Sequence, residues 1–179
     1  MGERVLNGET GLAMSDQDYD WLGPGVYFWE ADPVRAYEWA EEKVSHGDYE
    51  TPFIIGAVID LGNCLDLMAR EDLELVAAAY DSLRAIHDAD GRLNELPTNR
   101  LGEDRKLRFL DCAVLRHLHS IAQNAGVREI EPVDTVRGLF TEGGELFPGS
   151  GFKRQTHVQL AVYNPANIKG FFRVPEEKF

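Results

Sequence analysis

The chain has 179 residues, of which 44% are hydrophobic and 27% are charged, a composition typical of one soluble globular domain with a hydrophobic core. Its formal net charge of -13 disfavours a dedicated nucleic-acid binder, because contacts with phosphates need Lys and Arg. Its two cysteines are too few for a disulfide scaffold, and it has neither a membrane-length apolar run nor a secretory signal, so we expect a single cytoplasmic domain over residues 1–179 with no membrane contact.

The first segment with a clear pattern covers residues 21–29 and reads Trp-Leu-Gly-Pro-Gly-Val-Tyr-Phe-Trp. Its glycines permit a tight turn and the close approach of a ligand to the backbone. The aromatic residues that follow offer flat faces on which a planar ring can stack. An ordinary buried strand edge has the same pattern, so this segment alone leaves both interpretations open.

A helix is predicted directly after these aromatic residues. Asp32 can cap the free amides and Pro33 suits the first helical position, so the helix is expected to run from there to about residue 46. Residues 53–61 form a near-continuous apolar run that is short enough for a buried strand. A turn then leads toward a short strand at 64–67.

Two longer helices are predicted in the middle of the chain. Residues 70–88 carry an apolar stripe at helical spacing, residues 91–102 are typical of a loop, and a second stripe covers 104–125. A glycine-rich, mobile loop is expected at 141–155. Strands are predicted near 133–140, 156–163 and 168–174. This order predicts an α+β domain with a mainly antiparallel core.

A second motif lies near the end of the chain, where residues 156–168 read Thr-His-Val-Gln-Leu-Ala-Val-Tyr-Asn-Pro-Ala-Asn-Ile. Together with the turn Gly23-Pro24-Gly25-Val26-Tyr27-Phe28, this segment resembles the ADP-ribosyltransferase superfamily, the fold of diphtheria toxin and the poly-ADP-ribose polymerases. The segment Asp134-Thr135-Val136-Arg137-Gly138 also resembles the strand before the active-site loop of bacterial toxin-like members. The resemblance covers about residues 3–174. It implies an ADP-ribosyltransferase-like split β core with flanking helices and a helical insertion around 70–125.

The resemblance implies that NAD is the substrate and that Tyr27 stacks on its nicotinamide ring. Tyr37 or Trp39 on the next helix would close the other side of the ring, and the backbone of Gly25 would hydrogen-bond the carboxamide. Both Tyr27 and Trp39 also suit a hydrophobic core, which leaves a structural interpretation open for each of them. The predicted cofactor-binding residues are Ser15, Gly25, Tyr27, Phe28, Tyr37 and Trp39.

The predicted catalytic residues are Gln159, His157 and Tyr27. Gln159 stands at the position of the family's catalytic glutamate, and a neutral amide stabilises an oxocarbenium-like transition state less than a carboxylate does. Weak transfer of ADP-ribose, or hydrolysis of NAD by water, is therefore expected. His157 points to the same strand face as Gln159 and could act as a base near neutral pH. The alternatives are that both merely face solvent, or that Glu142 or Glu145 lends the missing carboxylate.

A second departure from the family pattern concerns its first strand, which carries a His-Gly or Arg-Gly pair that binds the adenosine ribose and the carboxamide. Here residues 1–6 resemble the helix that follows that strand, and no histidine precedes His46. Ser15 cannot replace a ring that stacks and donates a hydrogen bond. We therefore expect an unpaired sheet edge beside the NAD cleft, and weak or no NAD turnover by residues 1–179 alone.

These observations lead to one main functional hypothesis and two alternatives. The main hypothesis is an NAD-consuming ADP-ribosyltransferase acting as a toxin or defence effector, and its acceptor is expected to be a protein or small molecule rather than a nucleic acid. An NAD glycohydrolase of the same fold, or a binding module that has lost catalysis, are the alternatives. An antitoxin or immunity protein would be a fitting partner. No metal site is predicted, because His117 and His119 diverge on their helix.

Overall fold

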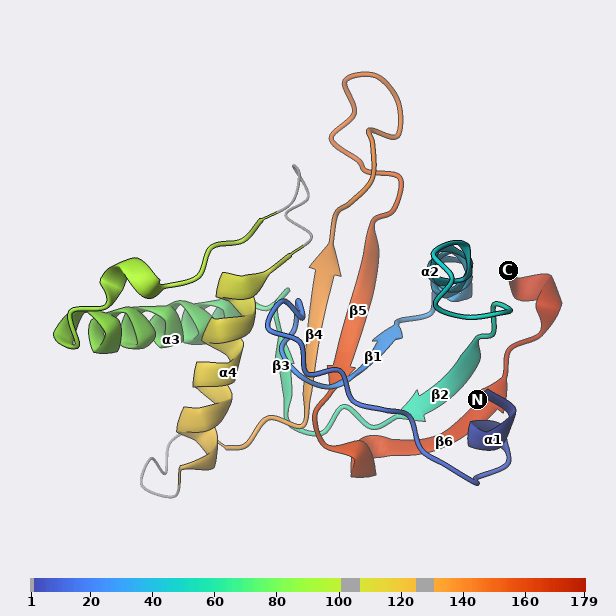
Figure 1. Ribbon diagram of the computed structural model, residues 1–179, viewed down its shortest axis with the longest axis horizontal. Helices are drawn as coiled ribbons and strands as arrows, with labels where there is room; N and C mark the ends of the chain where they lie inside the picture. Colours follow the sequence, from blue (N-terminus) through green and yellow to red (C-terminus); the bar gives the residue numbers. More distant parts are fainter. Residues whose placement is uncertain (1, 101–106, 125–130) are drawn as a thin grey trace.

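The computed structural model describes residues 2–100, 107–124 and 131–179, which form an α+β fold (Figure 1). The helices are α1 (Gly2–Leu6), α2 (Pro33–Ser45), α3 (Arg70–Ala89) and α4 (Phe109–Gln123), with 3-10 turns η1 (Leu93–Glu95), η2 (Pro165–Asn167) and η3 (Glu176–Lys178). The strands are β1 (Val26–Trp29), β2 (Ile55–Ile59), β3 (Cys64–Asp66), β4 (Thr135–Phe140), β5 (His157–Val162) and β6 (Ile168–Arg173).

The strands form two sheets. The larger one has the order β1-β5-β4-β3, with β5 antiparallel to both β1 and β4. The smaller one is the antiparallel pair β2-β6. The core is mainly antiparallel, as predicted, but β3 runs parallel to β4 and makes the larger sheet mixed. A parallel pair needs a long crossover, and the segment that contains α3 and α4 supplies it.

Two hydrophobic cores lie on the two faces of the larger sheet, because alternate residues of a strand point to opposite faces. The main core joins α3 and α4 to one face, and its buried members are Leu22, Leu65, Ala79, Val114, Leu115, Leu118, Val133, Val136, Phe140 and Ala161. The second core lies between the two sheets and contains Val26, Leu160 and Val162, with Leu12, Phe28, Ile59 and Ile168 packed against them. Neighbouring residues of β1 and β5 therefore belong to different cores.

A local sequence signal accounts for the start of α2. The side chain of Asp32 accepts a hydrogen bond from the Arg35 amide at 2.9 Å, so α2 begins at Pro33 as predicted. The helix α3 also matches its predicted stripe. The helix α4 begins later than predicted, because Leu107 pairs through its backbone with Arg100 instead of entering the helix. Its predicted end near 125 and its predicted first turn at 104–106 fall outside the described residues.

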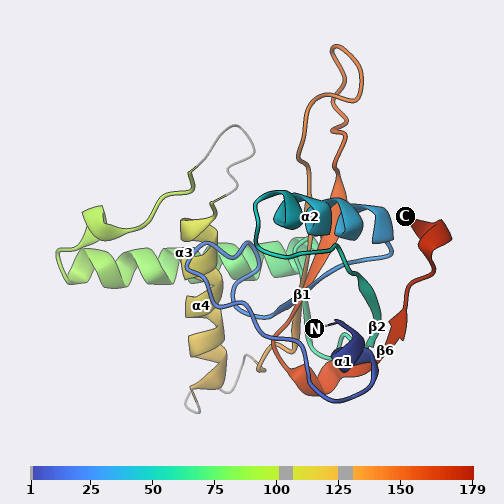
Figure 2. The same ribbon diagram turned by 45° about the vertical axis from the view of Figure 1, so that its right-hand side comes forward.

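Residues 141–156 connect β4 to β5 and project from the body of the molecule, as both views show (Figures 1 and 2). We call this segment the β4–β5 arm. A backbone bridge between Glu145 and Lys153 holds its two sides together, and Phe147 and Phe152 are exposed on it. No helix in the described part of the chain is both long and apolar enough to span a bilayer.

Candidate functional site

The two motifs singled out in the sequence form adjacent strands of the larger sheet. Strand β1 pairs antiparallel with β5, and the register sets Trp29 opposite Gln159 and Tyr27 opposite Ala161. Because side chains alternate between the two faces of a strand, Tyr27, Trp29, Gln159 and His157 all project from the same face. Residues that are distant in the sequence are thereby brought to one region.

The side chain of Tyr27 anchors the turn that precedes β1. Its hydroxyl donates a hydrogen bond to the Gly23 carbonyl at 2.7 Å and accepts one from the Leu22 amide at 2.9 Å. The ring packs against the main core, and burial raises the pKa of the phenol well above its usual range. The half-buried ring is thus held in a fixed orientation beside the sheet.

The backbone of Gly25, which was expected to bind a carboxamide, is engaged with Ser15. The Gly25 amide donates to the Ser15 carbonyl at 2.9 Å, and the Ser15 amide donates to the Gly25 carbonyl at 2.8 Å. The Ser15 hydroxyl in turn donates to Asp20 at 3.0 Å. A ligand can use the Gly25 amide only if it displaces Ser15.

Two indole rings meet where β1 joins α2. The rings of Trp29 and Trp39 lie 5.5 Å apart at an angle of 50°, and Trp39 remains 39% exposed. The indole nitrogen of Trp29 is buried and has no hydrogen-bond acceptor. Tyr37, on the same helix, stacks instead on Phe179 with 4.6 Å between the ring centres. Of the two residues predicted to close over a nicotinamide, Trp39 is therefore the one adjacent to β1.

His157 belongs to a buried group of charged and polar side chains at the base of the β4–β5 arm. Its side chain is fully buried, with Nδ1 2.7 Å from the Gln155 carbonyl and 3.6 Å from Glu142 Oε1. The same Glu142 oxygen accepts a hydrogen bond from Arg35 Nη2 at 3.1 Å. His157 Nε2 and Arg35 Nε are buried without a partner. Glu142 is therefore ion-paired, and its carboxylate does not point freely into solvent.

Sequence reasoning did not identify Arg35 as part of this group. The residue lies in the first turn of α2, and its partner Glu142 is 107 positions away. No local signal marks Arg35, because Val34 in the same turn is exposed and an arginine there is ordinarily expected to face solvent as well. The side chain of Gln159, two positions after His157, is half-buried and makes no hydrogen bond with the described residues. Its amide therefore remains available to a ligand.

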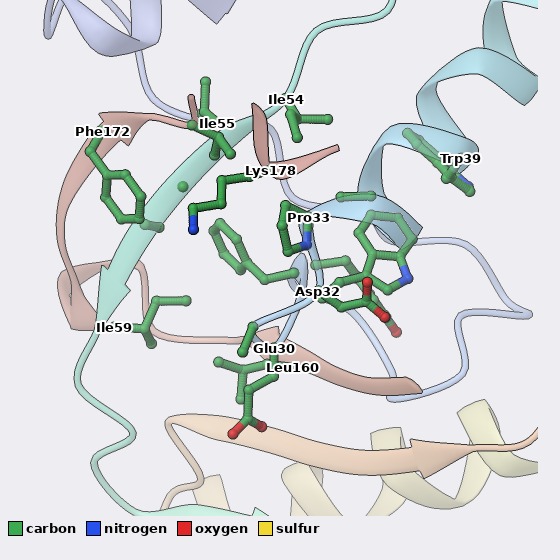
Figure 3. A pocket seen from close by; sticks show the side chains of 18 of the residues that line it. Glu30, Asp32, Pro33, Trp39, Ile54, Ile55, Ile59, Leu160, Phe172 and Lys178 are labelled. Atoms are coloured by element: carbon green, nitrogen blue, oxygen red, sulfur yellow. The ribbon is translucent and has the colours of Figure 1, made fainter. Parts of the chain in front are cut away.

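A cavity of about 750 Å³ lies between β1, α2, β2 and the segment after β6 (Figure 3). Phe172 of β6 and Trp39 of α2 lie on opposite sides of it in this view, with Lys178 between them. The predicted cofactor-binding residues that line it are Tyr27, Phe28 and Trp39.

The other predicted site residues are outside the lining of this cavity: Gln159, His157, Ser15, Gly25 and Tyr37. The cavity and the Gln159 side chain are therefore separate features.

The carboxylates at the cavity are already engaged by other groups. Glu30 accepts a hydrogen bond from Arg137 Nη2 at 3.0 Å, and Arg137 Nη1 also donates to Asp66 at 2.9 Å. These carboxylates raise the pKa of the Arg137 guanidinium. Asp32 caps α2. The remaining lining is mostly apolar, with Lys178 as its one cationic side chain among the described residues.

Comparison with known proteins provides no relative from which function could be transferred. No protein-family model, no curated protein and no solved structure matches the chain. Function has therefore to be inferred from the residues and from the way the fold combines them.

Proposed function

We propose that the protein consumes NAD as an enzyme of the ADP-ribosyltransferase type, transferring ADP-ribose to an acceptor or, as the close alternative, to water. The observation that carries this proposal is the direct pairing of the aromatic strand β1 with β5, in a register that sets Trp29 beside Gln159. The motif resemblance of both strands and the split arrangement of two sheets support it. The β1–β5 face is the proposed site of the nicotinamide-ribose.

The chemistry assigned to this face is cleavage of the bond between nicotinamide and ribose. The C–N bonding electrons leave with nicotinamide, positive charge develops on the ribose, and the acceptor oxygen or nitrogen bonds to the same carbon while losing its proton. The Gln159 amide oxygen would accept a hydrogen bond from a ribose hydroxyl and stabilise the developing charge through its dipole. The rings of Tyr27 and Trp39 would contact the nicotinamide.

A binding module without catalysis is the second candidate, and specific observations favour it. Gln159 supplies no negative charge, and the Gly25 amide is occupied by Ser15. The side chains of His157 and Glu142 are buried at the base of the arm, so they are not placed to contact an acceptor of ADP-ribose. A module of this kind would bind NAD or a related nucleotide and release no nicotinamide.

Nicotinamide release from NAD, measured in wild type and in Gln159→Glu, tests the proposal. Adding a carboxylate at the ribose should increase release by about tenfold to a hundredfold, on the scale of one well-placed electrostatic group in a transition state. The matched control is Gln123→Glu, the same chemical change at the end of α4, which should leave the rate unchanged. Labelled NAD separates transfer, which leaves ADP-ribose on the acceptor, from hydrolysis, which releases it.

Three results decide between the candidates. A rate increase confined to Gln159→Glu supports the enzyme. Binding of NAD without nicotinamide release by either protein supports the binding module. Equal effects of Gln159→Glu and Gln123→Glu contradict the assignment of Gln159 to the site.

A further inference from the structure

The cavity between the two sheets is bordered by two strand edges. Strand β1 is an end strand of the larger sheet, and β2 belongs to a sheet of two strands. Both strands contribute to the cavity lining. In Figure 1, β2 lies between β1 and β6, so the edge of β2 that is not paired with β6 faces β1. The two sheets are thus separated by a gap with a strand edge on each side.

The edge of β1 that faces this gap presents backbone hydrogen-bonding groups. The amide and carbonyl of Gly25 both point to this side, where they bond Ser15. Because these directions alternate along an antiparallel strand, the backbone groups of Tyr27 and Trp29 also point to the gap, whereas those of Val26 and Phe28 point to β5. An edge with such groups is a template for another strand.

The volume of the cavity corresponds to a short strand. Each residue of a strand occupies roughly 160 Å³, given a rise of about 3.3 Å, an interstrand spacing of about 4.8 Å and a layer spacing of about 10 Å. The cavity of about 750 Å³ therefore accommodates about five residues. The strands on its two sides are of matching length, with four residues in β1 and five in β2.

The lining of the cavity suits apolar side chains better than the two phosphates of a dinucleotide. The two phosphates of a dinucleotide need several hydrogen-bond donors or cations. In the described residues, the lining offers Lys178, while the carboxylates of Glu30 and Asp32 are engaged and would repel phosphate. The net charge of -13 favours a partner with basic rather than acidic ends.

We propose that this gap binds an extended polypeptide strand of about five residues, apolar at alternate positions and basic at its ends. The strand joins the two sheets into one, in the order β3-β4-β5-β1-strand-β2-β6. It bonds the backbone of Tyr27 and Trp29 on one side and the edge of β2 on the other. This interaction goes beyond the proposed NAD chemistry and does not depend on it.

Amide hydrogen exchange of the full chain tests the proposal, with a synthetic peptide of alternating Val and Thr flanked by Lys as the probe. At saturating peptide, exchange at the Tyr27 and Trp29 amides should slow by about tenfold or more, because both amides gain an acceptor. The Phe28 amide, directed toward β5, should not change. A control peptide with Pro in its centre lacks a donor and should have no effect.

A pair of variants shows whether the peptide occupies the cavity. Ala57→Phe places a large ring in the lining, whereas Val58→Phe places the same ring on the adjacent, exposed residue of β2 that is outside the lining. Peptide protection should be lost in the first variant and kept in the second. If Ala57→Phe does not fold, Ala36→Phe fills the same cavity from α2.

A tethered form of the probe removes weak affinity as an explanation for a negative result. Gly2 lies against the ring of Phe53, which lines the cavity, so a peptide linked to the N-terminus is held nearby at an effective concentration of about a millimolar. Unchanged exchange at Tyr27 and Trp29 in the tethered protein overturns the proposal. Protection that persists in Ala57→Phe also overturns it.

Discussion

The phenol of Tyr27 closes the turn that leads into the aromatic strand. Its hydroxyl bonds the backbone of Leu22 and Gly23, and Leu22 is completely buried. Loss of the hydroxyl would leave a buried amide and a carbonyl without their partner. Buried polar groups without partners cost more than the net gain from an intact hydrogen bond.

The first prediction at the residue scale concerns this hydroxyl. Tyr27→Phe should lower the free energy of unfolding by about 1–3 kcal/mol, measured by urea denaturation. Tyr37→Phe is the control, because the ring of Tyr37 stacks on Phe179 at the surface and should tolerate the change. If the Tyr27 ring contacts nicotinamide, stabilisation by NAD should survive in Tyr27→Phe and weaken in Tyr27→Ala. Equal stability of wild type and Tyr27→Phe would show that the hydroxyl is not an anchor.

His119 is a second buried residue whose environment determines a measurable property. Its ring stacks on Tyr163 with 3.6 Å between the ring centres, and its Nε2 is buried without a partner. Burial lowers the pKa of His119 to about 4, from an ordinary value of 6.5. The folded state therefore holds a neutral imidazole that the unfolded chain would protonate in mild acid.

This difference predicts how stability changes with pH. Because the folded-state pKa lies below the unfolded one, the contribution of His119 is present above about pH 6.5 and is lost as the pH falls toward 4. Between pH 7 and pH 5 the loss should be about 2 kcal/mol, measured by denaturant unfolding at each pH. His119→Phe should remove this part of the pH dependence, whereas replacement of the exposed His46 should not. An unchanged pH dependence in His119→Phe would exclude this origin.

At the scale of elements, the buried group around Glu142 connects three parts of the fold. Arg35 comes from α2, Glu142 from the start of the β4–β5 arm, and His157 from the first position of β5. The side chains of Arg35 and Glu142 are 10% and 5% exposed. Their ion pair is therefore shielded from water and holds the base of the arm against α2.

Removal of one partner of this pair should be costly. Arg35→Met leaves the Glu142 carboxylate buried without its cation and should lower the free energy of unfolding by about 3–5 kcal/mol. Arg4→Met removes a surface pair with Glu9 and should cost less than about 1 kcal/mol. Thermal or urea unfolding measures both. Similar small losses in the two variants would mean that the Arg35–Glu142 pair does not hold the base of the arm against α2.

Local chemistry explains which elements could be predicted from sequence. The cap at Asp32 and the apolar stripe of 70–88 each act within a few residues, and α2 and α3 were predicted correctly. The parallel pairing of β3 with β4 was not predicted, because it depends on how the α3–α4 segment crosses from one strand to the next. The late start of α4 has a similar cause, the pairing of Leu107 with Arg100.

At the scale of the whole molecule, the candidate site could likewise be predicted from the sequence only in part. The motifs predicted that Tyr27 and Gln159 lie across a common cleft. Strands β1 and β5 do pair directly, but Gln159 is outside the cavity that Tyr27 lines. The motifs did not predict the group formed by Arg35 and Glu142, since contacts between such distant residues have no local signature. Nor did they predict that Ser15 would occupy the backbone of Gly25, because a single backbone bridge leaves no pattern in composition or periodicity.

The fold contains two neighbouring features with different proposed ligands, the β1–β5 face and the apolar cavity. The β1–β5 face carries Gln159 and the proposed NAD chemistry. The apolar cavity lies toward the smaller sheet and is lined by Phe28 and Leu160. Tyr27 and Trp39 line this cavity as well, so Gln159, which is outside the lining, is the residue that distinguishes the two features.

An NMR titration with NAD tests the central claim most directly, by following the side-chain N–H signals of Trp29 and Gln159. Both groups have no hydrogen-bond partner in the described protein, so a ligand on the β1–β5 face should shift both signals, while the side-chain amide of Gln123 on α4 should stay unchanged. Saturating NAD without a shift at Trp29 and Gln159, or with shifts confined to α3 and α4, would contradict the assignment of this face as the NAD site.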